Sequence, residues 1–283
     1  MQELTHRQNP SSGYPPPNLP IENITGHTKK VSKFLSSIEH VRRRHSTGNL
    51  QILDVGCGSG YAVTRFLGRP GDHVLGIDMY EPNIAYATRH FEKPDLAFEL
   101  RTAESLEPDA KRFEIIILAD ILEHLTDPGA VLARCRTLLA PNGRALITIP
   151  NGYGPFELES ALARFPVLGK AALTVTDYFV AVLNKYGPFK GIWTAAAAGT
   201  PEDLPYNLES GHVQFFTRSR FRTLLGDAGF QILETENLSL LSGPFTNYLF
   251  GAWPAFCRWN AAVANSMPSF MASAWYLECA AIP

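Results

Sequence analysis

Apolar residues recur between residues 50 and 150 in short continuous runs, and the segments between the runs carry apolar residues at helical spacing. The runs read "LQILDV", "HVLGID", "LAFELR", "FEIIILA" and "ALITIP" in chain order. An uninterrupted run such as residues 113–119 is typical of a strand that is buried on both faces. Strands that alternate with helices predict a parallel, doubly wound α/β sheet, whose ligands bind at the carboxyl ends of the strands.

The segments between these runs are expected to be helical. The sequence predicts helices at residues 28–45, from the glycine-containing loop to about residue 67, at about residues 82–92, and from Asp127 onward. In the last of these, Asp127 is a suitable N-cap and Pro128 suits the first helical position, because its missing N–H would have no partner there.

The regular alternation ends after residue 150. Residues 151–211 hold helix-like apolar material between loops with glycine and proline, and a connection of this length is usually functional or a small subdomain. Thr217 is a suitable N-cap and Gly229 a suitable end for one more helix. The remaining segments are a sixth strand at 230–238, an apolar insertion at 239–272 and a last strand at 273–282. We therefore expect a seven-stranded, mostly parallel sheet with helical or apolar insertions after strands five and six.

The composition narrows the class of protein. The 283 residues are 45% hydrophobic and 18% charged, as in a folded globular protein. The formal charge of −2 gives no basic field that would draw the chain to nucleic acid. The four cysteines have no paired spacing, which favours neither disulfides nor a zinc site. With neither a signal peptide nor an apolar run of membrane-spanning length, a cytoplasmic protein is expected.

Basic residues gather in two places within the first expected helix. "KKVSK" and "VRRRH" occupy residues 29–33 and 41–45, and we interpret them as the solvated face of an amphipathic helix. A contact with phosphate or with a membrane surface is the alternative. Residues 1–20 combine prolines with polar residues, which predicts a mobile arm or a lid that orders on ligand binding.

A glycine-rich loop follows the first strand. Gly56, Gly58 and Gly60 form the pattern D-x-G-x-G-x-G that starts at Asp54, and glycines let the backbone turn sharply and approach a ligand closely. The dinucleotide fingerprint G-x-G-x-x-G would need its last glycine where Tyr61 stands, so a ligand smaller than a pyrophosphate fits better. Asp78 ends the next strand, where a carboxylate can accept hydrogen bonds from ribose hydroxyls or cap a helix.

Several segments together resemble a known family. "ILDVGCGSG", "GIDMYEP", "TAESL", "FEIIILADILEHLTDP" and "LLAPNGRALITIPN" resemble, in order, the motifs of class I S-adenosylmethionine-dependent methyltransferases. "GHVQFFTRSRFRTLLGDAGF" resembles the segment that opens the last third of many small-molecule members, and "DILEH" resembles ubiquinone-biosynthesis O-methyltransferases. The resemblance implies a Rossmann-like methyltransferase fold, with S-adenosyl-L-methionine as cofactor and S-adenosyl-L-homocysteine as product.

The resemblance also implies a division of the chain and a role for each matching residue. The expected parts are an N-terminal arm and helix at 1–48, a cofactor-binding core at 49–150, an insertion capping the acceptor site at 151–211, and the rest of the sheet at 212–283. The expected cofactor residues are Asp54, Gly56, Cys57, Gly58 and Gly60 for the amino acid end, Asp78 and Met79 for the ribose and adenine, Ala103 and Glu104 for the adenine edge, and Ala119 and Asp120 near the sulfonium. Cys57 is given no redox role.

Two histidines are the candidate catalytic residues. A sulfonium methyl is already activated, so the enzyme mainly aligns an acceptor and removes its proton. His124 and His212 suit this task because the usual imidazole pKa lies near neutrality. Each can instead be a histidine that only shapes its loop. No metal ligand is predicted, although Asp120, Glu123 and His124 match positions that the resemblance links to a divalent ion.

The composition of the two insertions indicates the chemical class of the acceptor. Both are rich in Phe, Tyr, Trp, Leu and Ala, which suits an apolar or ring-bearing small molecule, methylated most readily at oxygen. A cap with its own core, a homodimer surface, or a membrane-surface contact through 245–272 are the alternatives. Other hypotheses are methylation at nitrogen or carbon of a natural product, sugar or lipid-linked intermediate, a non-catalytic scaffold, a nicotinamide dehydrogenase, and a nucleic-acid methyltransferase.

Overall fold

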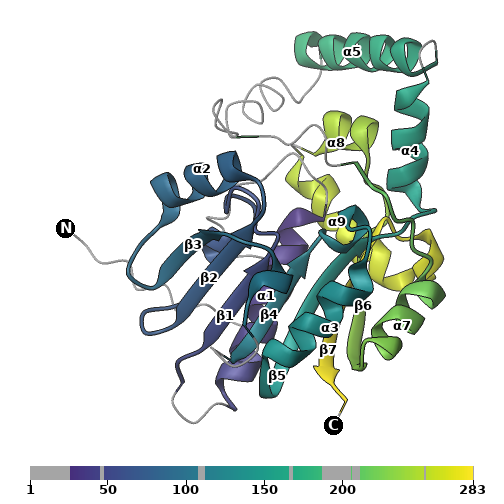
Figure 1. The fold of residues 1–283 in the computed structure, drawn as a ribbon. Helices are drawn as coiled ribbons and strands as arrows, with labels where there is room; N and C mark the ends of the chain where they lie inside the picture. The colour runs from purple at the N-terminus through teal and green to yellow at the C-terminus, as the bar shows by residue number, and fades with distance from the viewer. Residues whose placement is uncertain are drawn as a thin grey trace.

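The computed structural model describes residues 26–44, 48–107, 112–165, 168–186, 205, 211–251 and 253–282. Within these residues, seven strands form a single sheet of order β3-β2-β1-β4-β5-β7-β6 (Figure 1). The strands are β1 (Gln51–Val55), β2 (His73–Asp78), β3 (Leu96–Leu100), β4 (Phe113–Ala119), β5 (Leu139–Pro150), β6 (Phe230–Ser239) and β7 (Ala274–Ala281). Strands β1 to β5 pair in parallel, and β7 runs antiparallel between β5 and β6. The predicted seven-stranded, mostly parallel sheet is confirmed.

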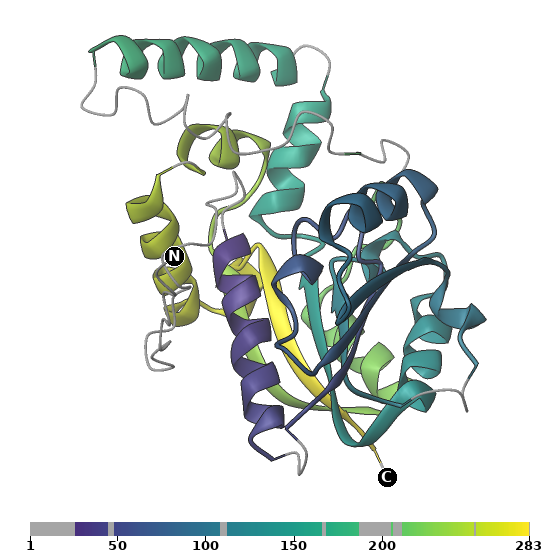
Figure 2. The same cartoon turned by 90° about the vertical axis from the view of Figure 1, so that its left-hand side faces the viewer.

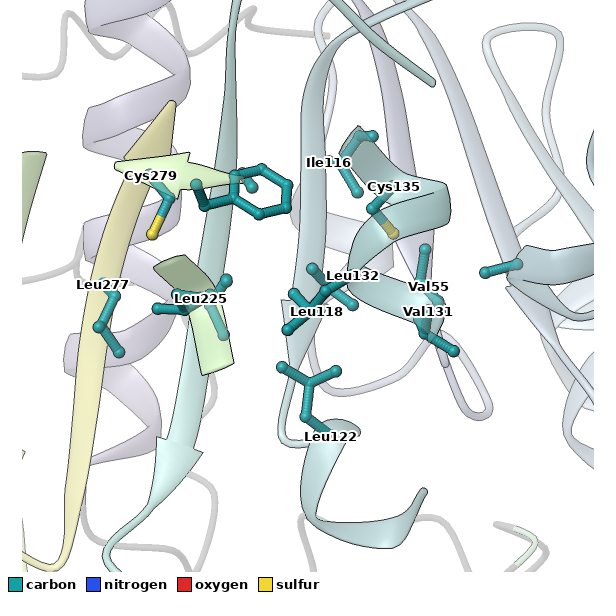
Figure 3. Packing of buried hydrophobic residues seen from close by; sticks show 14 of the residues in the cluster. Val55, Ile116, Leu118, Leu122, Val131, Leu132, Cys135, Leu225, Leu277 and Cys279 are labelled. Carbon is teal, nitrogen blue, oxygen red and sulfur yellow. The ribbon is translucent and has the colours of Figure 1, made fainter. Parts of the chain in front are cut away.

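Helices cover both faces of the sheet. Those of the regular part are α1 (His27–Arg42), α2 (Glu81–Phe91), α3 (Pro128–Leu138) and α7 (Arg218–Asp227). On β4, Ile115 and Ile117 belong to the cluster under α1 and α2, whereas Ile116 and Leu118 belong to the cluster under α3 and α7 (Figure 3). Alternate side chains of a strand point to opposite faces, so a strand buried on both sides needs an unbroken apolar run.

The insertions after β5 and β6 are helical. They contain α4 (Pro155–Arg164), α5 (Leu168–Tyr186), α8 (Pro244–Phe250) and α9 (Pro254–Ser266). Helix α4 leads away from the sheet, and α5 lies across the end of α4 that is distant from the sheet (Figures 1 and 2). Helix α9 packs against β6, and its Ala261 and Ala264 are buried while Trp259 is half exposed, so part of the 239–272 insertion belongs to the core. No helix in the described ranges is long and apolar enough to cross a membrane.

The expected helix ends are confirmed. Asp127 accepts a hydrogen bond from Ala130 N at 3.0 Å and caps α3. Thr217 accepts one from Arg220 N at 3.3 Å and caps α7. Gly229 follows α7 with a φ of +78°, the left-handed conformation that glycine adopts without steric cost.

The prediction of a helix after the glycine-rich loop is wrong. The segment holds only the short 3₁₀ helix η1 (Thr64–Phe66), and Leu67 is already extended. Two contacts compete with helical hydrogen bonding: the Thr64 hydroxyl donates to Asp54, and Arg65 N donates to Gly60 O. The β-branched Val63 and Thr64 also have a low helix propensity. The backbone of this segment is therefore set by its contacts with the loop and with β1.

The lysines of "KKVSK" do not form a solvated face, so that interpretation is also wrong. Lys29 is only 5% exposed and pairs with Glu236 at 3.0 Å. Lys33 pairs with Glu234 and Glu236 at 2.7 and 2.8 Å. Strand β6 presents these carboxylates beneath α1, so the lysines turn inward to meet them. The expected arm at residues 1–20 lies outside the described residues.

Arg42, at the end of α1, also turns inward. Its guanidinium donates two hydrogen bonds of 2.6 Å to the buried Asp72 carboxylate, which also accepts from Leu50 N and Arg69 N. Burial alone would raise the pKa of Asp72, but the hydrogen bonds, led by those from Arg42, hold it below its usual value. The pair fastens α1 to the connection between β1 and β2.

Candidate cofactor and acceptor site

The glycine-rich loop forms a tight turn above the end of β1. Gly56, Gly58 and Gly60 have φ values of +70°, +54° and +68°, a region that other residues rarely adopt. The N–H groups of Gly56 and Cys57 both donate to Ile77 O, which ties the loop to β2. A Cβ at Gly58 would meet nothing closer than Asn83 Nδ2 at 3.9 Å. Gly58 therefore leaves open space at the loop, into which a ligand can approach the backbone.

Asp54 lies beneath this loop with one oxygen unsatisfied. Its Oδ2 accepts a hydrogen bond of 2.7 Å from the Thr64 hydroxyl, and its Oδ1 is buried with no hydrogen-bond partner among the described residues. Burial raises the pKa of Asp54 to about 7, although the bond from Thr64 opposes this. A buried carboxylate oxygen without a donor is costly, and a cationic ligand group would supply the missing partner.

Asp78 holds the loop from the end of β2. Its Oδ2 accepts from Gly58 N at 2.9 Å, and its Oδ1 accepts from Tyr80 N at 2.8 Å. Each carboxylate oxygen can accept more than one hydrogen bond, so Asp78 can bind ribose hydroxyls while it keeps the loop in place.

The remaining residues expected around the adenine differ in their exposure to solvent. The Met79 side chain is 76% exposed and Glu104 is also exposed, whereas Ala103 is buried in the core cluster under α3. Met79 and Glu104 are thus available to a ligand as side chains, and Ala103 contributes its packing to the short helix η2 (Ala103–Ser105). The Cys57 thiol is buried, which raises its pKa and disfavours the thiolate.

Asp120 follows Ala119, the last residue of β4, and has an unusual backbone conformation. Its φ is +52°, a strained value for a residue other than glycine, which in proteins often marks a functional site. Its side chain accepts hydrogen bonds from Lys30 Nζ at 2.6 Å and from the Thr148 hydroxyl at 2.8 Å. Burial alone would raise the pKa of Asp120, but the Lys30 ammonium lowers it, so the carboxylate is charged.

Lys30 and His27 bring α1 into the site, and the sequence interpretation missed both. His27 contacts Ala62 O at 3.0 Å, next to the glycine-rich loop, while Lys30 reaches Asp120. The sequence did contain a signal for these two residues, because positions 27, 30 and 34 share one helical face and Phe34 was expected to point inward. Thr148, buried on β5, could not be found from spacing, because its contact depends on the register of β4 against β5.

His124 and Glu123 lie in the short 3₁₀ helix η3 (Leu122–His124). Nδ1 of His124 lies 3.2 Å from Gly211 O and, because a carbonyl only accepts, Nδ1 is the donor. Burial lowers the pKa of His124, which favours the neutral ring. Burial and then the nearby Asp120 carboxylate raise the pKa of Glu123 well above its usual range, which favours the uncharged carboxyl group.

His212 meets His124 from a distant part of the chain. The backbone N–H groups of Val213 and Gln214 donate to Glu123 O, which fixes the segment after residue 211 against η3. The two imidazole rings lie edge to face, with centroids 4.9 Å apart. The structure therefore brings the two candidate catalytic histidines together, although 87 residues separate His124 from Gly211.

Glu157 on α4 completes this cluster, and the sequence interpretation missed it. Its Oε1 lies 2.6 Å from Nδ1 of His212, and Glu157 is buried. The centroid of the Phe156 ring lies 5.7 Å from the imidazole centroid of His212. A glutamate in an amphipathic helix carries no signal of its own, because the contact with residue 212 forms between positions 55 residues apart in the chain.

Glu159, two residues further along α4, has a different partner. Its Oε2 accepts from the backbone N–H groups of Phe245 and Thr246 at 3.1 and 2.9 Å, and the Thr246 hydroxyl also donates to this carboxylate. These are the first N–H groups of α8, which lack partners within the helix. Glu159 thereby fastens α8 to α4.

The cluster also has the spacing of a cation site. Glu123, His124 and His212 each offer one donor atom within 4.8 Å of the other two. However, Nδ1 of His212 is engaged by Glu157, and the Glu123 carboxyl group favours its uncharged form. The family resemblance linked Asp120, Glu123 and His124 to a divalent ion, but Asp120 is hydrogen-bonded to Lys30 and Thr148. These contacts favour a hydrogen-bonded cluster, and the absence of metal ligands stays a prediction.

Comparisons with known proteins agree with this architecture. Residues 27–235 match the family model described as a methyltransferase domain. A ubiquinone biosynthesis O-methyltransferase from Bradyrhizobium diazoefficiens is 38% identical over 114 residues, which are 40% of this chain and 44% of that protein. The protein of the same name from Rhodopseudomonas palustris (strain HaA2) is 40% identical over 119 residues, which are 41% and 46% of the two chains. The matched region spans less than half the length of these relatives.

Solved structures show the same fold at low sequence identity. The [4+2]-cyclase SpnF aligns with a TM-score of 0.50 at 18% identity, over 90% of this chain and 83% of that one. PKMT2 from Rickettsia typhi, in complex with AdoHcy, aligns with a TM-score of 0.50 at 15% identity, over 83% and 49% of the two chains.

The sheet, the loop above β1 and the acid that ends β2 define an α/β protein of the Rossmann-like class. Because the family model covers well over half of the chain, the protein belongs to the methyltransferase-domain family. The resemblance to class I methyltransferases is confirmed.

Proposed function

We propose that this protein transfers a methyl group from S-adenosyl-L-methionine to an oxygen of a small or medium-sized, ring-bearing acceptor. The observation that carries the proposal is the cradle formed by Asp54, Gly58 and Asp78. It combines a buried carboxylate oxygen that lacks a donor, an open glycine in a left-handed turn, and a carboxylate at the end of β2. The family match supports the same reaction class.

The residues of the cradle suit the parts of this cofactor. The unsatisfied Oδ1 of Asp54 would accept a hydrogen bond from the α-ammonium group, and Asp78 would accept from the ribose hydroxyls. Exposed Met79 would pack against the adenine, and Lys30 would face the carboxylate end from α1. The sequence predictions for Cys57, Ala103, Glu104 and Ala119 remain part of this proposal.

The acceptor side would lie between η3 and the insertions. When bound, the cofactor supplies a methyl group that is already electrophilic, so the protein has to orient the acceptor, exclude water and take a proton. His124 and His212 stand together at the carboxyl end of the sheet, beside Phe156. The insertion at 151–211 would cap this side. The O-methyltransferase names of the relatives favour oxygen, and the ring in our acceptor class rests on the aromatic insertions.

A cytoplasmic protein is part of the same proposal. The four cysteines are free thiols, and Cys57, Cys135 and Cys279 are buried. Free thiols are typical of a reducing compartment.

Cofactor binding is tested with a matched pair of glycine variants. Gly58→Ala puts a methyl group into the open space of the cradle, whereas Gly48→Ala puts one where nothing lies within 4 Å, at a similarly positive φ. Both variants carry the same backbone strain, of about 1 kcal/mol. In isothermal titration we expect Gly58→Ala to weaken S-adenosylhomocysteine binding at least about tenfold, and Gly48→Ala to leave it unchanged.

The wild-type protein provides the decisive measurement. No binding of S-adenosylmethionine or S-adenosylhomocysteine at millimolar concentration would refute the proposed function. The acceptor class is then tested with methyl-labelled cofactor against catechols, monophenols, aliphatic alcohols and aromatic amines. We expect label transfer to ring hydroxyls, and transfer to amines alone would contradict the preference for oxygen.

A further inference from the structure

The Glu157–His212 pair joins a carboxylate directly to an imidazole in the acceptor cluster, which consists of Glu123, His124, Glu157 and His212. Its Nδ1–Oε1 distance of 2.6 Å is short, and the Glu157 side chain is about nine-tenths buried. His124 rests on a backbone carbonyl instead, and the Oε1 of Glu123 is 3.9 Å from Nε2 of His124, beyond hydrogen-bond range. His212 therefore has a carboxylate as a direct hydrogen-bond partner.

An ionised carboxylate can only accept hydrogen bonds, so Nδ1 of His212 must carry the proton. A neutral imidazole has a single N–H, and Nε2 then presents its lone pair on the edge of the ring turned away from α4. The ring is held by more than this bond, since His124 and Phe156 pack beside it. The contact thus fixes both the tautomer and the orientation of His212.

We propose that Glu157 is a positioning residue that fixes His212 as the Nδ1–H tautomer, so that Nε2 takes the proton of the methyl-accepting hydroxyl. This inference rests on the proposed function for its chemistry, while the tautomer can be measured without any acceptor. It assigns the proton to His212 and gives His124 the task of packing against its ring.

The charges of the reaction explain why a carboxylate is useful here. The acceptor oxygen forms a bond to the methyl carbon, the bond from that carbon to sulfur breaks, and the O–H proton moves to Nε2 of His212. The sulfonium becomes a neutral thioether, and the imidazole becomes an imidazolium, so one positive charge leaves the sulfur and appears on the ring. Glu157 lies 2.6 Å from that ring and stabilises the charge where it appears.

The other titratable groups around His212 fit this assignment. From η3 it faces His124 and Glu123, and from α4 it faces Glu157, while Asp120 acts electrostatically on Glu123. Asp120 is occupied by Lys30 and Thr148. Among these groups, the carboxylate in contact with the imidazole is that of Glu157.

The tautomer is tested by long-range ¹H–¹⁵N spectra of histidine-labelled protein, with His212→Asn used to assign the His212 signals. The wild-type protein should show protonated Nδ1 and unprotonated Nε2 at residue 212. Glu157→Met, which has similar length but no acceptor, should lose this signature. Glu157→Gln should keep it, because the amide oxygen still accepts from Nδ1. Glu159→Gln is the matched control on α4, and it should leave the His212 signals in place.

Turnover separates positioning from a structural role. With the best acceptor of the labelled panel, Glu157→Met should lower kcat about 100-fold and Glu157→Gln about tenfold, with S-adenosylhomocysteine affinity unchanged. Protonated Nε2 in the wild-type protein, an unchanged tautomer in Glu157→Met, or a lost tautomer with full kcat would each overturn the proposal. A wild-type protein that methylates nothing would refute only the proposed function, and the spectra would still decide this inference.

Discussion

The cofactor half and the acceptor half of the site are assembled over different distances along the chain. In the cofactor half, the hydrogen bonds from Thr64 to Asp54 and from Gly58 to Asp78 span 10 and 20 residues. In the acceptor half, the contacts of His212 with Glu157 and of His124 with Gly211 span 55 and 87 residues. The first half is built mainly from consecutive strand ends, with Lys30 of α1 added across 90 residues, whereas the second needs the chain to return to η3 after the insertion.

This difference means that the two halves can be disturbed separately. The cofactor half is held by backbone turns and by acids at strand ends, so it depends on the sheet. The acceptor half is held by side chains from η3, α4 and the segment after residue 211. A substitution in one half should therefore leave the measured property of the other half intact.

The largest effect is expected from His212→Gln. Loss of a general base lowers kcat by a factor of about 100 to 10,000, and S-adenosylhomocysteine affinity should stay within about twofold. Steady-state methyl transfer and isothermal titration measure the two quantities. A parallel loss of cofactor affinity would show that the halves are coupled.

Arg42→Met tests how far the site depends on the stability of the fold. Removing one partner of a buried ion pair leaves Asp72 uncompensated, so we expect the free energy of unfolding to fall by about 3 kcal/mol at pH 7. Urea denaturation measures it, and the folded variant should bind S-adenosylhomocysteine as the wild type does.

The effect of Arg42→Met should depend on pH. The folded-state pKa of Asp72 is lowered, so the carboxylate stabilises the fold above its unfolded-state pKa of about 3.9, and this contribution is lost as the pH falls below it. The difference between wild type and variant should therefore shrink below about pH 4. A difference that stays constant down to pH 3 would mean that Arg42 acts through packing alone.

Asp78→Ala should weaken S-adenosylhomocysteine binding about 100-fold, because two hydrogen bonds to a charged acceptor contribute about 1.5 kcal/mol each. Isothermal titration measures this, with Glu92→Ala, an exposed acid beyond α2, as the control. The tautomer of His212 should not change. If Asp78→Ala bound the ligand normally, the placement of the ribose at β2 would be wrong.

Lys30→Met is expected to have the smallest effect, about a tenfold loss of affinity for S-adenosylhomocysteine. The variant removes the cation that pairs with Asp120. Titration at low and high salt distinguishes a charge effect from a packing effect. Tighter binding in the variant would instead show that the Lys30–Asp120 pair competes with the ligand.

Much of the fold could be predicted from the sequence, since the unbroken run around Ile116 and the caps at Asp127 and Thr217 are local signals of buried strands and helix ends. The segment after Gly60 was mispredicted because contacts with Asp54 and Gly60 O override the helical pattern. Tertiary contacts outweigh propensity in such short segments.

The site divides in the same way. The proximity of Gly58 and Asp78 could be predicted, because consecutive strand ends meet at one edge of a parallel sheet, whereas the expectation for Asp54 came from the resemblance to methyltransferases. Lys30 was concealed within a basic run that looked like a solvated surface, although it lies on the buried face of α1. Glu157 could not be found, because its partner His212 is set by the path of the insertion and not by any sequence pattern.

Helix α4 carries Glu157 and Glu159 two positions apart, and residues at that spacing lie on different sides of a helix. One carboxylate holds the imidazole of His212, and the other holds the first turn of α8. Helix α4 therefore supports both contacts, each through a different carboxylate. A redesign of the insertion for a new acceptor should therefore preserve the contacts of α4 with His212 and with α8 together.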